Sequence, residues 1–292
     1  MSHKFYIVDV FAEEKLQGNQ LAVYPDAGMI HADLMQKIAL EMNFSETTFI
    51  TKKDIENLVF KVRIFTKESE LPFAGHPTLG TAYVIKSMIL KENIELLTLD
   101  MKAGMIPVAF TYTDDELDTV WMKQLNPVFG ETHEPQHVAD FLGLTVDDID
   151  SRFPIQEVST GVPFFIIPLR TKAAVVNIRL DVEKLEKFNK NTKAKWPLVF
   201  CPYTDKPGND LKVRMITPFM EDPATGSANG CLAAYLVRHR YFNESWIDVR
   251  VEQGAEVNRP SVLYLKAKEI SPTEIEVNVG GIVALVAKGE LI

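Results

Sequence analysis

VRIFTKESELPFAGH, at residues 62–76, returns as VRMITPFMEDPATGS at residues 213–227. The two stretches lie 151 positions apart, and the same offset holds without a gap as far as Ala82 and Ala233. A repeat of about half the chain is too long for a solenoid of small stacked units. It predicts two similar domains, each with a strand, a loop of fixed length and a helix that begins near a glycine.

Length and composition agree with two folded domains. The chain has 292 residues, of which 46% are hydrophobic and 24% are charged, and one domain usually holds about 100–200 residues. This composition differs from that of disordered, collagen-like or coiled-coil proteins. Strand-like and helical patterns alternate along the chain, and the Pro- and Gly-containing segment Asn126–Gly130 is the expected linker between the domains.

Charge and targeting signals argue against several classes of partner. The chain carries 31 Lys and Arg against 40 Asp and Glu, a net charge of −9, and its basic residues are scattered. Because nucleic acids and anionic membranes attract dense positive charge, we expect neither as a partner. We find no signal-peptide pattern and no apolar run of about 18 residues, so we expect a cytoplasmic protein. Two cysteines, Cys201 and Cys231, are too few for a disulfide framework or a structural zinc site.

The repeated loops end at Gly75 and Gly226, each at the expected start of a helix. The backbone can approach a ligand closely at glycine, and the first N–H groups of a helix have no partner within it. Together with the helix dipole, these groups favour a carboxylate or a phosphate. The two helix starts are therefore candidates for binding an anionic substrate or for stabilising an oxyanion or enolate. The alternative is that each glycine only begins a buried helix.

Two titratable residues belong to the repeated loops. His76 follows Gly75, and a histidine at a helix N-terminus is expected to be neutral and able to donate or shuttle a proton. Asp222 precedes Gly226, whereas Leu71 stands at the matching place in the first copy, so the two halves differ chemically. Beside N–H donors this carboxylate is expected to stay ionised, as a base or an orienting acceptor. The alternatives are a structural histidine and a helix-capping aspartate.

Glu46 lies in the segment NFSETTF, residues 43–49, between an expected helix end and an expected strand start. Connections of this kind commonly display functional groups, yet most glutamates there are simply solvated. The residue pattern alone therefore gives Glu46 no special role.

Several motifs, in one order along the chain, resemble a single family. They are GNQLAV (18–23), NFSET (43–47), ELPFAGHPT (70–78), EDPATGSA (221–228), QG (253–254) and RPS (259–261). On these motifs the sequence resembles the PhzF-like proteins, the phenazine-biosynthesis family of isomerases. The resemblance covers nearly the whole chain.

The resemblance implies an α/β (α+β) architecture, the diaminopimelate epimerase fold. In this fold two pseudo-symmetric domains each wrap a curved mixed sheet around a central helix, and the active site lies in the cleft between them. Because the last strand of that fold returns to the first domain, residues 1–125 plus about 277–292 are expected to form one domain and residues 126–276 the other. Family members are typically homodimers without a metal or an organic cofactor, and we expect the same of this chain.

The resemblance also implies roles for individual residues. It makes Glu46, His76 and Asp222 catalytic, with Glu46 as the acid/base group. The expected substrate- or anion-binding residues are Asn19, Ser45, Gly75, Gly226 and Ser227. The implied reaction removes a C–H proton from a small cyclic amino-hydroxy acid and returns it at another carbon, which shifts a double bond. Since a carboxylate with this task needs its pKa raised by desolvation, Glu46 is expected to line a closed apolar pocket.

Two features depart from related patterns. Epimerases and racemases with this fold use a thiol at each of the two helix starts, whereas neither helix start here carries one. Cys201 and Cys231 are instead expected to be small buried hydrophobic residues. Asn258 stands where the family usually has glycine, and because asparagine tolerates a left-handed backbone we expect the turn to be kept. The role of Arg259, as a ligand of substrate or of a buried carboxylate, stays open.

Three functions remain in competition. The favoured one is a cofactor-independent isomerase that acts on a small carboxylate-bearing substrate. The second is a cofactor-free epimerase or racemase with Glu46 and Asp222 as bases on opposite faces of the substrate. The third is a non-catalytic homodimer that binds a small anion. The substrate and its pathway do not follow from the sequence, because substrate choice depends on the shape of the pocket.

Overall fold

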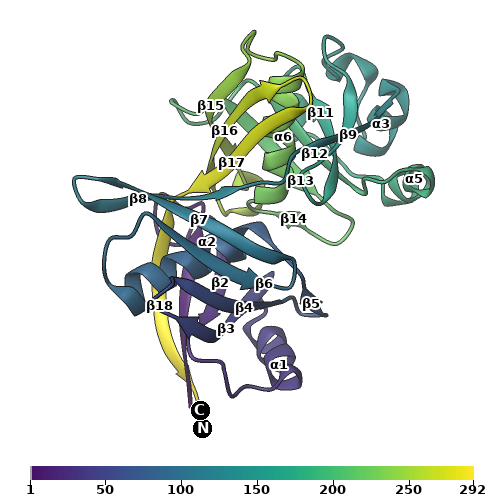
Figure 1. The fold of residues 1–292 in the computed structure, drawn as a ribbon. Coiled ribbons are helices and arrows are strands. Elements are labelled where there is room, and N and C mark those ends of the chain that lie inside the picture. Colours follow the sequence, from purple (N-terminus) through teal and green to yellow (C-terminus); the bar gives the residue numbers. More distant parts are fainter. Residues whose placement is uncertain (1) are drawn as a thin grey trace. The chain divides into compact units, whose positions relative to one another are not determined.

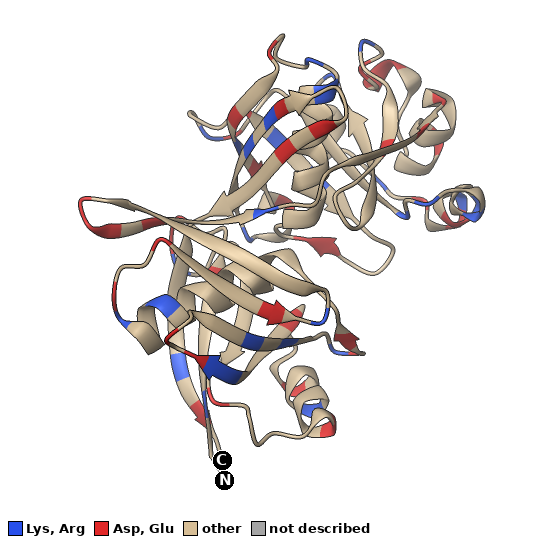
Figure 2. Ribbon diagram, in the orientation of Figure 1, with Lys and Arg blue, Asp and Glu red and all other residues tan. Residues whose placement is uncertain are grey.

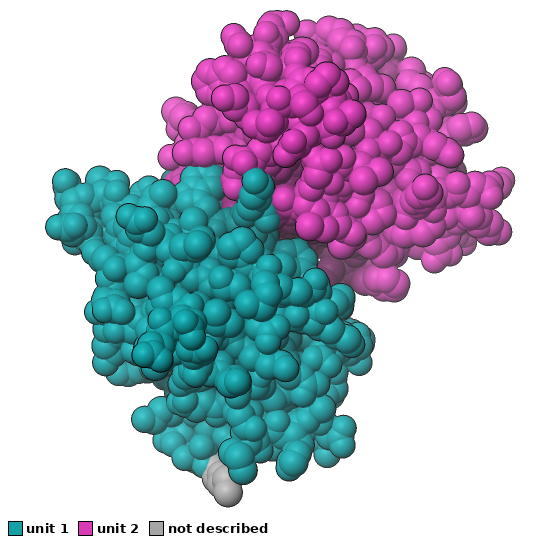
Figure 3. Space-filling model, viewed as in Figure 1, with its two compact units in different colours: residues 1–123, 280–292 teal, residues 124–279 magenta. Residues whose placement is uncertain are grey.

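Two units make up the chain in the computed structural model, which describes residues 2–292. Unit 1 comprises residues 1–123 and 280–292, and unit 2 comprises residues 124–279 (Figure 3). The prediction of a linker at residues 126–130 is wrong in part, because residues 128–130 are the start of strand β9, which pairs with β10. The glycine in this segment suggested a loop, but Gly130 lies in an extended strand against Glu157.

Unit 1 consists of nine strands, two α-helices and a π-helical turn in its described residues. These elements are β1 (His3–Val10), β2 (Asn19–Tyr24), α1 (Ala32–Met42), β3 (Glu46–Asp54), β4 (Val59–Phe65), β5 (Glu70–Leu71), α2 (Gly75–Val84), η1 (Ile85–Leu90), β6 (Leu96–Met101), β7 (Gly104–Thr113), β8 (Glu116–Lys123) and β18 (Val283–Leu291).

The sheet of unit 1 has the strand order β18-β1-β2-β3-β4-β6-β7-β8, with the short strand β5 also beside β4. The pairs β2–β3 and β4–β6 are parallel and the others are antiparallel. Helix α2 contacts strands from β18 to β8, so the sheet curves around it (Figure 1). Gly80 allows this close approach, because a Cβ there would lie 2.7 Å from Leu21 Cδ2 and 2.8 Å from Val10 Cγ2.

Unit 2 has the same plan with additional helices. Its elements are β9 (Val128–His133), α3 (Pro135–Leu142), η2 (Val146–Asp148), β10 (Ile155–Ser159), β11 (Pro163–Pro168), α4 (Lys172–Val176), α5 (Val182–Phe188), η3 (Asn189–Asn191), β12 (Trp196–Cys201), β13 (Leu211–Ile216), β14 (Glu221–Asp222), α6 (Gly226–Arg238), β15 (Trp246–Gln253), η4 (Ala255–Val257), β16 (Ser261–Ser271) and β17 (Glu274–Gly281), of which the last continues into unit 1.

Strand pairing in unit 2 repeats that of unit 1. The order β9-β10-β11-β12-β13-β15-β16 has parallel pairs at β11–β12 and β13–β15 and antiparallel pairs elsewhere. Helix α6 contacts β10, β11, β15 and β16 and is buried along nearly its whole length. A helix that is buried on all sides is a central helix, so α6 occupies the same place in its sheet as α2 does in unit 1 (Figure 1).

The sequence repeat is also a repeat of register. Ile64 pairs with Leu71 between β4 and β5, and Met215 pairs with Asp222 between β13 and β14, again with an offset of 151. The turns that connect these strands are the same, because the N–H of Thr66 or Thr217 donates at 2.9 Å to the carbonyl of the residue three positions later. The two-domain prediction from the repeat is therefore confirmed at the level of the fold.

Charged residues do not gather on one part of either unit. Figure 2 shows basic residues interspersed with acidic ones on both units, as the sequence suggested. Across residues 2–292, the helices are too short or too polar to cross a membrane.

Candidate active site

Glu46 and His76 come together at one end of the sheet of unit 1. Glu46 is the first residue of β3, opposite Leu21 of the parallel strand β2, and His76 is the second residue of α2. Glu46 Oε2 lies 3.3 Å from His76 Nε2, and the two side chains are 16% and 7% exposed. Thr81 Oγ1 donates to Thr48 Oγ1 at 2.8 Å further along both elements, so α2 runs in the same direction as β3. This alignment brings the start of the helix to the start of the strand.

His76 is a neutral imidazole. Burial lowers its pKa from 6.5 to about 3, and a hydrogen bond to the backbone of Gln20 opposes that shift only in part. Within residues 2–292, Nε2 has no hydrogen-bond partner, so the bond to Gln20 uses Nδ1, which carries the proton. Nε2 therefore presents a lone pair toward the carboxyl group of Glu46. The expectation of a neutral histidine at this helix start is confirmed.

The other residues expected in unit 1 lie at the same end of its sheet. Asn19 is the buried first residue of β2 and pairs with Val10, and Ser45 directly precedes β3. Gly75 is the first residue of α2, and Ala74 before it gives the helix no side-chain cap. The first N–H groups of α2 therefore have no capping side chain from the residue that precedes the helix.

Asp222 lies in unit 2 at the end of the short strand β14. Its Oδ2 accepts a hydrogen bond of 2.7 Å from the hydroxyl of Thr225. Thr225 is the N-cap residue of α6, yet its side chain does not cap the helix. The threonine that precedes the helix thus binds the aspartate rather than a helix N–H group.

Gln253, which the sequence did not identify as a site residue, links Asp222, Thr225 and Asn229 by hydrogen bonds. The Oε1 atom of buried Gln253 accepts from the N–H of Thr225 (3.2 Å) and from Nδ2 of Asn229 (2.9 Å). Its Nε2 atom donates to the carbonyl of Asp222 (2.8 Å) and to Oγ1 of Thr225 (3.0 Å). The QG motif pointed to this position, but nothing in the sequence said which groups the side chain would bind.

Gly226 and Ser227 are the first two residues of α6, and Gly226 is buried. Asn258, directly after η4, adopts a left-handed conformation with φ of 57°, so the expectation that asparagine preserves this turn is confirmed. The N–H of Arg259 donates to the carbonyl of Gly254 at 3.0 Å, which closes the turn.

Both cysteines are buried, as expected. Burial raises the pKa of Cys231, inside α6, to about 11, and it also raises the pKa of Cys201 at the end of β12. A thiolate is the reactive form of cysteine, so neither thiol is suited to act as a base near neutral pH. A mechanism with two thiols therefore has no support in this chain.

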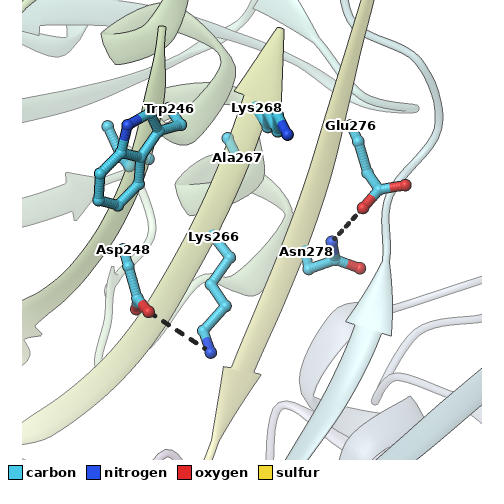
Figure 4. Close-up of a pocket in the computed structure, with 8 residues that line it drawn as sticks. Trp246, Asp248, Lys266, Ala267, Lys268, Glu276 and Asn278 are labelled. Atoms are coloured by element: carbon cyan, nitrogen blue, oxygen red, sulfur yellow. Dashed lines mark hydrogen bonds and ion pairs between the residues drawn. The ribbon is translucent and has the colours of Figure 1, made fainter. Parts of the chain in front are cut away.

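A pocket of about 380 Å³ in unit 2 is lined by residues of β15, β16 and β17 (Figure 4). It contains Trp246 and an ion pair of 3.5 Å between Lys266 and Asp248. None of the residues expected from the sequence lines it. The polar, paired groups in this pocket do not form an acid/base constellation.

The structure brings together Glu46 and His76 in unit 1 and, separately, Asp222 and the start of α6 in unit 2. That these two groups meet in one cleft, and that the protein is a homodimer without cofactor, stay predictions. Within residues 2–292, no three His, Cys, Asp or Glu side chains are grouped so as to hold a metal ion.

Comparisons with known proteins cover almost the whole chain. Residues 8–289 match the family model of phenazine biosynthesis-like proteins, PhzC-PhzF. The trans-2,3-dihydro-3-hydroxyanthranilate isomerase of Pseudomonas aeruginosa is 33% identical over 290 residues, which are 98% of each chain. Other relatives that cover nearly the whole chain are also named isomerases.

Solved structures show the same architecture. A PhzF-family phenazine biosynthesis protein from Bacillus anthracis superposes with a TM-score of 0.90 at 24% identity, over 100% of this chain and 99% of that one. A probable proline racemase from Agrobacterium radiobacter reaches a TM-score of 0.64 at 10% identity, over 99% of this chain and 93% of that one, which is a likeness of fold alone. The family match and the named relatives together show that this chain belongs to the PhzF family of phenazine biosynthesis-like proteins and is an isomerase with a diaminopimelate-epimerase-like fold.

Proposed function

We propose that the protein moves a proton between two carbons of a small cyclic amino-hydroxy acid, with Glu46 as the acid/base group. The observation that carries the proposal is the 3.3 Å approach of Glu46 Oε2 to the neutral His76. The named activity of the relative from Pseudomonas aeruginosa supports this substrate class and makes trans-2,3-dihydro-3-hydroxyanthranilate the first compound to test.

The reaction needs one proton carrier. A carboxylate oxygen of Glu46 takes the proton from a C–H group next to a double bond of the substrate. The electron pair of that C–H bond forms a new double bond. The electron pair of the old double bond then takes up a proton at the carbon of that bond farther from the original C–H group. Glu46 returns the proton there, so the atoms and charges balance without another reactant. Acid/base catalysis of this kind contributes about 10²- to 10⁴-fold to a rate.

His76 stabilises the intermediate stage of this transfer. Once Glu46 carries the proton, its carboxyl group donates to the lone pair on Nε2 of His76. Because Nδ1 keeps its own proton in the bond with Gln20, the imidazole does not need to become charged. A neutral acceptor holds the proton on Glu46 without removing it, and this keeps the proton ready for return.

In this proposal the substrate carboxylate is bound by N–H groups at the start of a helix. Gly75 and Gly226, with Ser227, provide the candidate donors, and Asn19 and Ser45 are the further polar groups. Asp222 serves as an oriented acceptor for the amino or hydroxyl group of the substrate. These assignments follow the expectations from the sequence.

The experiment is NMR in D₂O of trans-2,3-dihydro-3-hydroxyanthranilate, and of a panel of small amino and hydroxy acids, with the purified protein. We expect a shifted double bond with the wild type, and at least about 100-fold slower conversion with Glu46→Gln. The new C–H carbon receives hydrogen where Glu46 returns the substrate's own proton, and deuterium where Glu46 first exchanges that proton with solvent. Glu41→Gln is the matched control, because Glu41 is an exposed residue of α1 five positions earlier. This control variant is expected to retain the wild-type rate.

Three results would contradict the proposal. Full activity of Glu46→Gln would remove Glu46 as the acid/base group. Deuterium in an unaltered skeleton would favour the epimerase. If no compound in the panel reacts while a small acid raises the melting temperature, anion binding without catalysis becomes the better description.

A further inference from the structure

The repeat provides an internal comparison for the surroundings of Asp222. Where Asp222 stands in unit 2, Leu71 stands in unit 1, although the strand pairing is the same. If the polar groups around Asp222 served only the fold, both units would be expected to keep them. Unit 2 alone has these polar groups, as a comparison of Thr225 and Gln253 with their counterparts in unit 1 shows.

Thr225 and Asn229 of unit 2 correspond to Ala74 and Thr78 of unit 1, with the same offset of 151. The backbone contact is retained, because Asn229 Nδ2 donates to the carbonyl of Thr225 (3.0 Å) and Thr78 Oγ1 donates to the carbonyl of Ala74 (2.7 Å). The side-chain hydroxyl that binds Asp222 is missing in unit 1.

Gln253 corresponds to Met101. The register shows this, since β13 pairs Lys212 with Glu252 and β4 pairs Lys61 with Asp100, one position before each residue. The contact from the helix is again retained in a different form: Thr78 Oγ1 lies 3.8 Å from the sulfur of Met101, whereas Asn229 binds Gln253. Unit 1 therefore packs an apolar version of the network that unit 2 builds from polar groups.

The donor and acceptor of each hydrogen bond in the network of unit 2 follow from the chemical groups involved. Gln253 must direct its oxygen to the N–H of Thr225 and its amino group to the carbonyl of Asp222, because the backbone groups have only one possible role each. The amino group of Gln253 can only donate, so Thr225 Oγ1 accepts from it. The single hydroxyl hydrogen of Thr225 is then left for Asp222 Oδ2.

We propose that Gln253 and Thr225 are positioning residues of the isomerase, which fix the orientation of the Asp222 carboxylate and make its Oδ2 a hydrogen-bond acceptor. The proposal rests on the proposed function for the role of Asp222 in turnover. Gln253 also holds the Asp222 carbonyl and the Thr225 N–H, so one buried side chain sets the backbone on both sides of Pro223. Asn229 completes the arrangement by binding the same oxygen of Gln253.

The test compares Thr225→Val, which removes the hydroxyl at nearly constant volume, with Thr225→Ser, which keeps it. Gln253→Met copies the residue that unit 1 has at this position. Thr119→Val is the matched control, because buried Thr119 also donates to an aspartate, Asp118 Oδ2, at 3.0 Å. The first readout is kcat and KM for trans-2,3-dihydro-3-hydroxyanthranilate. The second, which needs no turnover, is the pH titration of the Asp222 side-chain ¹³C NMR signal, assigned by its loss in Asp222→Asn.

A charge-assisted hydrogen bond that orients the carboxylate which holds the substrate in place is expected to change kcat by about 10- to 100-fold. Thr225→Val and Gln253→Met should show this loss with KM changed less than about threefold, and Thr225→Ser should recover most of the rate. The titration midpoint of Asp222 should move to higher pH in Thr225→Val, because a donor to the charged form is removed.

The proposal is overturned if Thr225→Val behaves like Thr119→Val in both readouts. If the wild type does not convert the compound, the proposed substrate fails, and the titration alone decides whether Thr225 binds the carboxylate in solution. A midpoint that moves supports the inference and an unchanged midpoint contradicts it. Gln253→Met gives the same two readouts if Thr225→Val does not fold.

Discussion

Arg214 binds Glu221 through two parallel hydrogen bonds of 2.8 Å, from Nε to Oε1 and from Nη2 to Oε2. In unit 1 the pair Arg63 and Glu70 has the same geometry, with distances of 2.7 and 2.9 Å. The pairs differ in burial, since the side chains of the first pair are 9% and 11% exposed and those of the second are 29% and 25% exposed. Arg214 Nη1 also donates to the carbonyls of Val175 (2.7 Å) and Val176 (3.1 Å). Two copies of one ion pair thus sit in different dielectric surroundings.

This difference predicts unequal costs of removing the arginine. Arg214→Met leaves Glu221 buried without its main partner, so we expect a loss of about 3–5 kcal/mol in the free energy of unfolding. Arg63→Met leaves Glu70 more accessible to water, and the expected loss is about 1 kcal/mol. Urea unfolding of the two variants measures both values. Equal losses would show that neither burial nor the hydrogen bonds of Arg214 to the Val175 and Val176 carbonyls raise the cost of removing this arginine.

The repeat could be recognised from the sequence because equivalent loops kept their length and their key residues. The constant offset from Val62 to Ala82 predicted where the helices begin, and the register of β4–β5 and β13–β14 follows it. Local chemistry decided these features, since glycine and the turn-forming threonine act within a few residues of themselves. Glu46 needed the family resemblance, because a glutamate before a strand has no distinguishing local pattern.

The Gln253 network could not be predicted, for a physical reason. Gln253 lies 28 positions after Thr225, and its contacts depend on the parallel pairing of β13 with β15, which no local pattern encodes. Its counterpart Met101 has different chemistry, so the repeat did not align the two positions. Strand β9 was missed for the same reason. It forms by pairing with β10, whereas Pro127 before it and Gly130 within it suggest a loop.

His76 predicts a specific dependence of stability on pH. Its pKa is lowered to about 3 in the fold, mainly by burial, whereas a solvated histidine has a pKa of about 6.5. Between these values the unfolded chain binds more protons than the folded one, so the free energy of unfolding falls as the pH decreases through this range. His76→Gln should remove this contribution. Urea unfolding at pH 7, 6, 5 and 4 measures the slopes.

The slope of the wild type should exceed that of His76→Gln below pH 6.5, with the two converging above it. His137→Gln serves as the control, because His137 is an exposed histidine of α3. Identical slopes for the wild type and His76→Gln would contradict a buried, neutral His76.

The two thiols are expected to be unreactive in the folded protein. Burial raises the pKa of Cys231 to about 11 and also raises that of Cys201, so few thiolates form and reagents do not reach them. Ellman's reagent at pH 8 should therefore modify neither cysteine before unfolding and both in denaturant. Cys231→Ala should retain the isomerase activity. Rapid modification of the folded protein with loss of activity would restore a mechanism that uses a thiol.

A substitution of Gly254 tests whether the 254–259 turn supports the loop that carries Asp222. Its φ is 81°, and an added Cβ would lie 2.3 Å from the carbonyl oxygen of Arg259 and 2.4 Å from that of Pro223. Gly208 has a φ of 89° with nothing within 4 Å of such an atom, so Gly208→Ala measures backbone strain alone, about 1–2 kcal/mol. Gly254→Ala adds a clash with backbone, which cannot rotate away as a side chain can. We expect it to destabilise the protein by more than the control and to lower kcat, since Pro223 directly follows Asp222. Urea unfolding and the isomerase assay compare the two variants, and equal effects would mean that the 254–259 turn does not support the Asp222 loop.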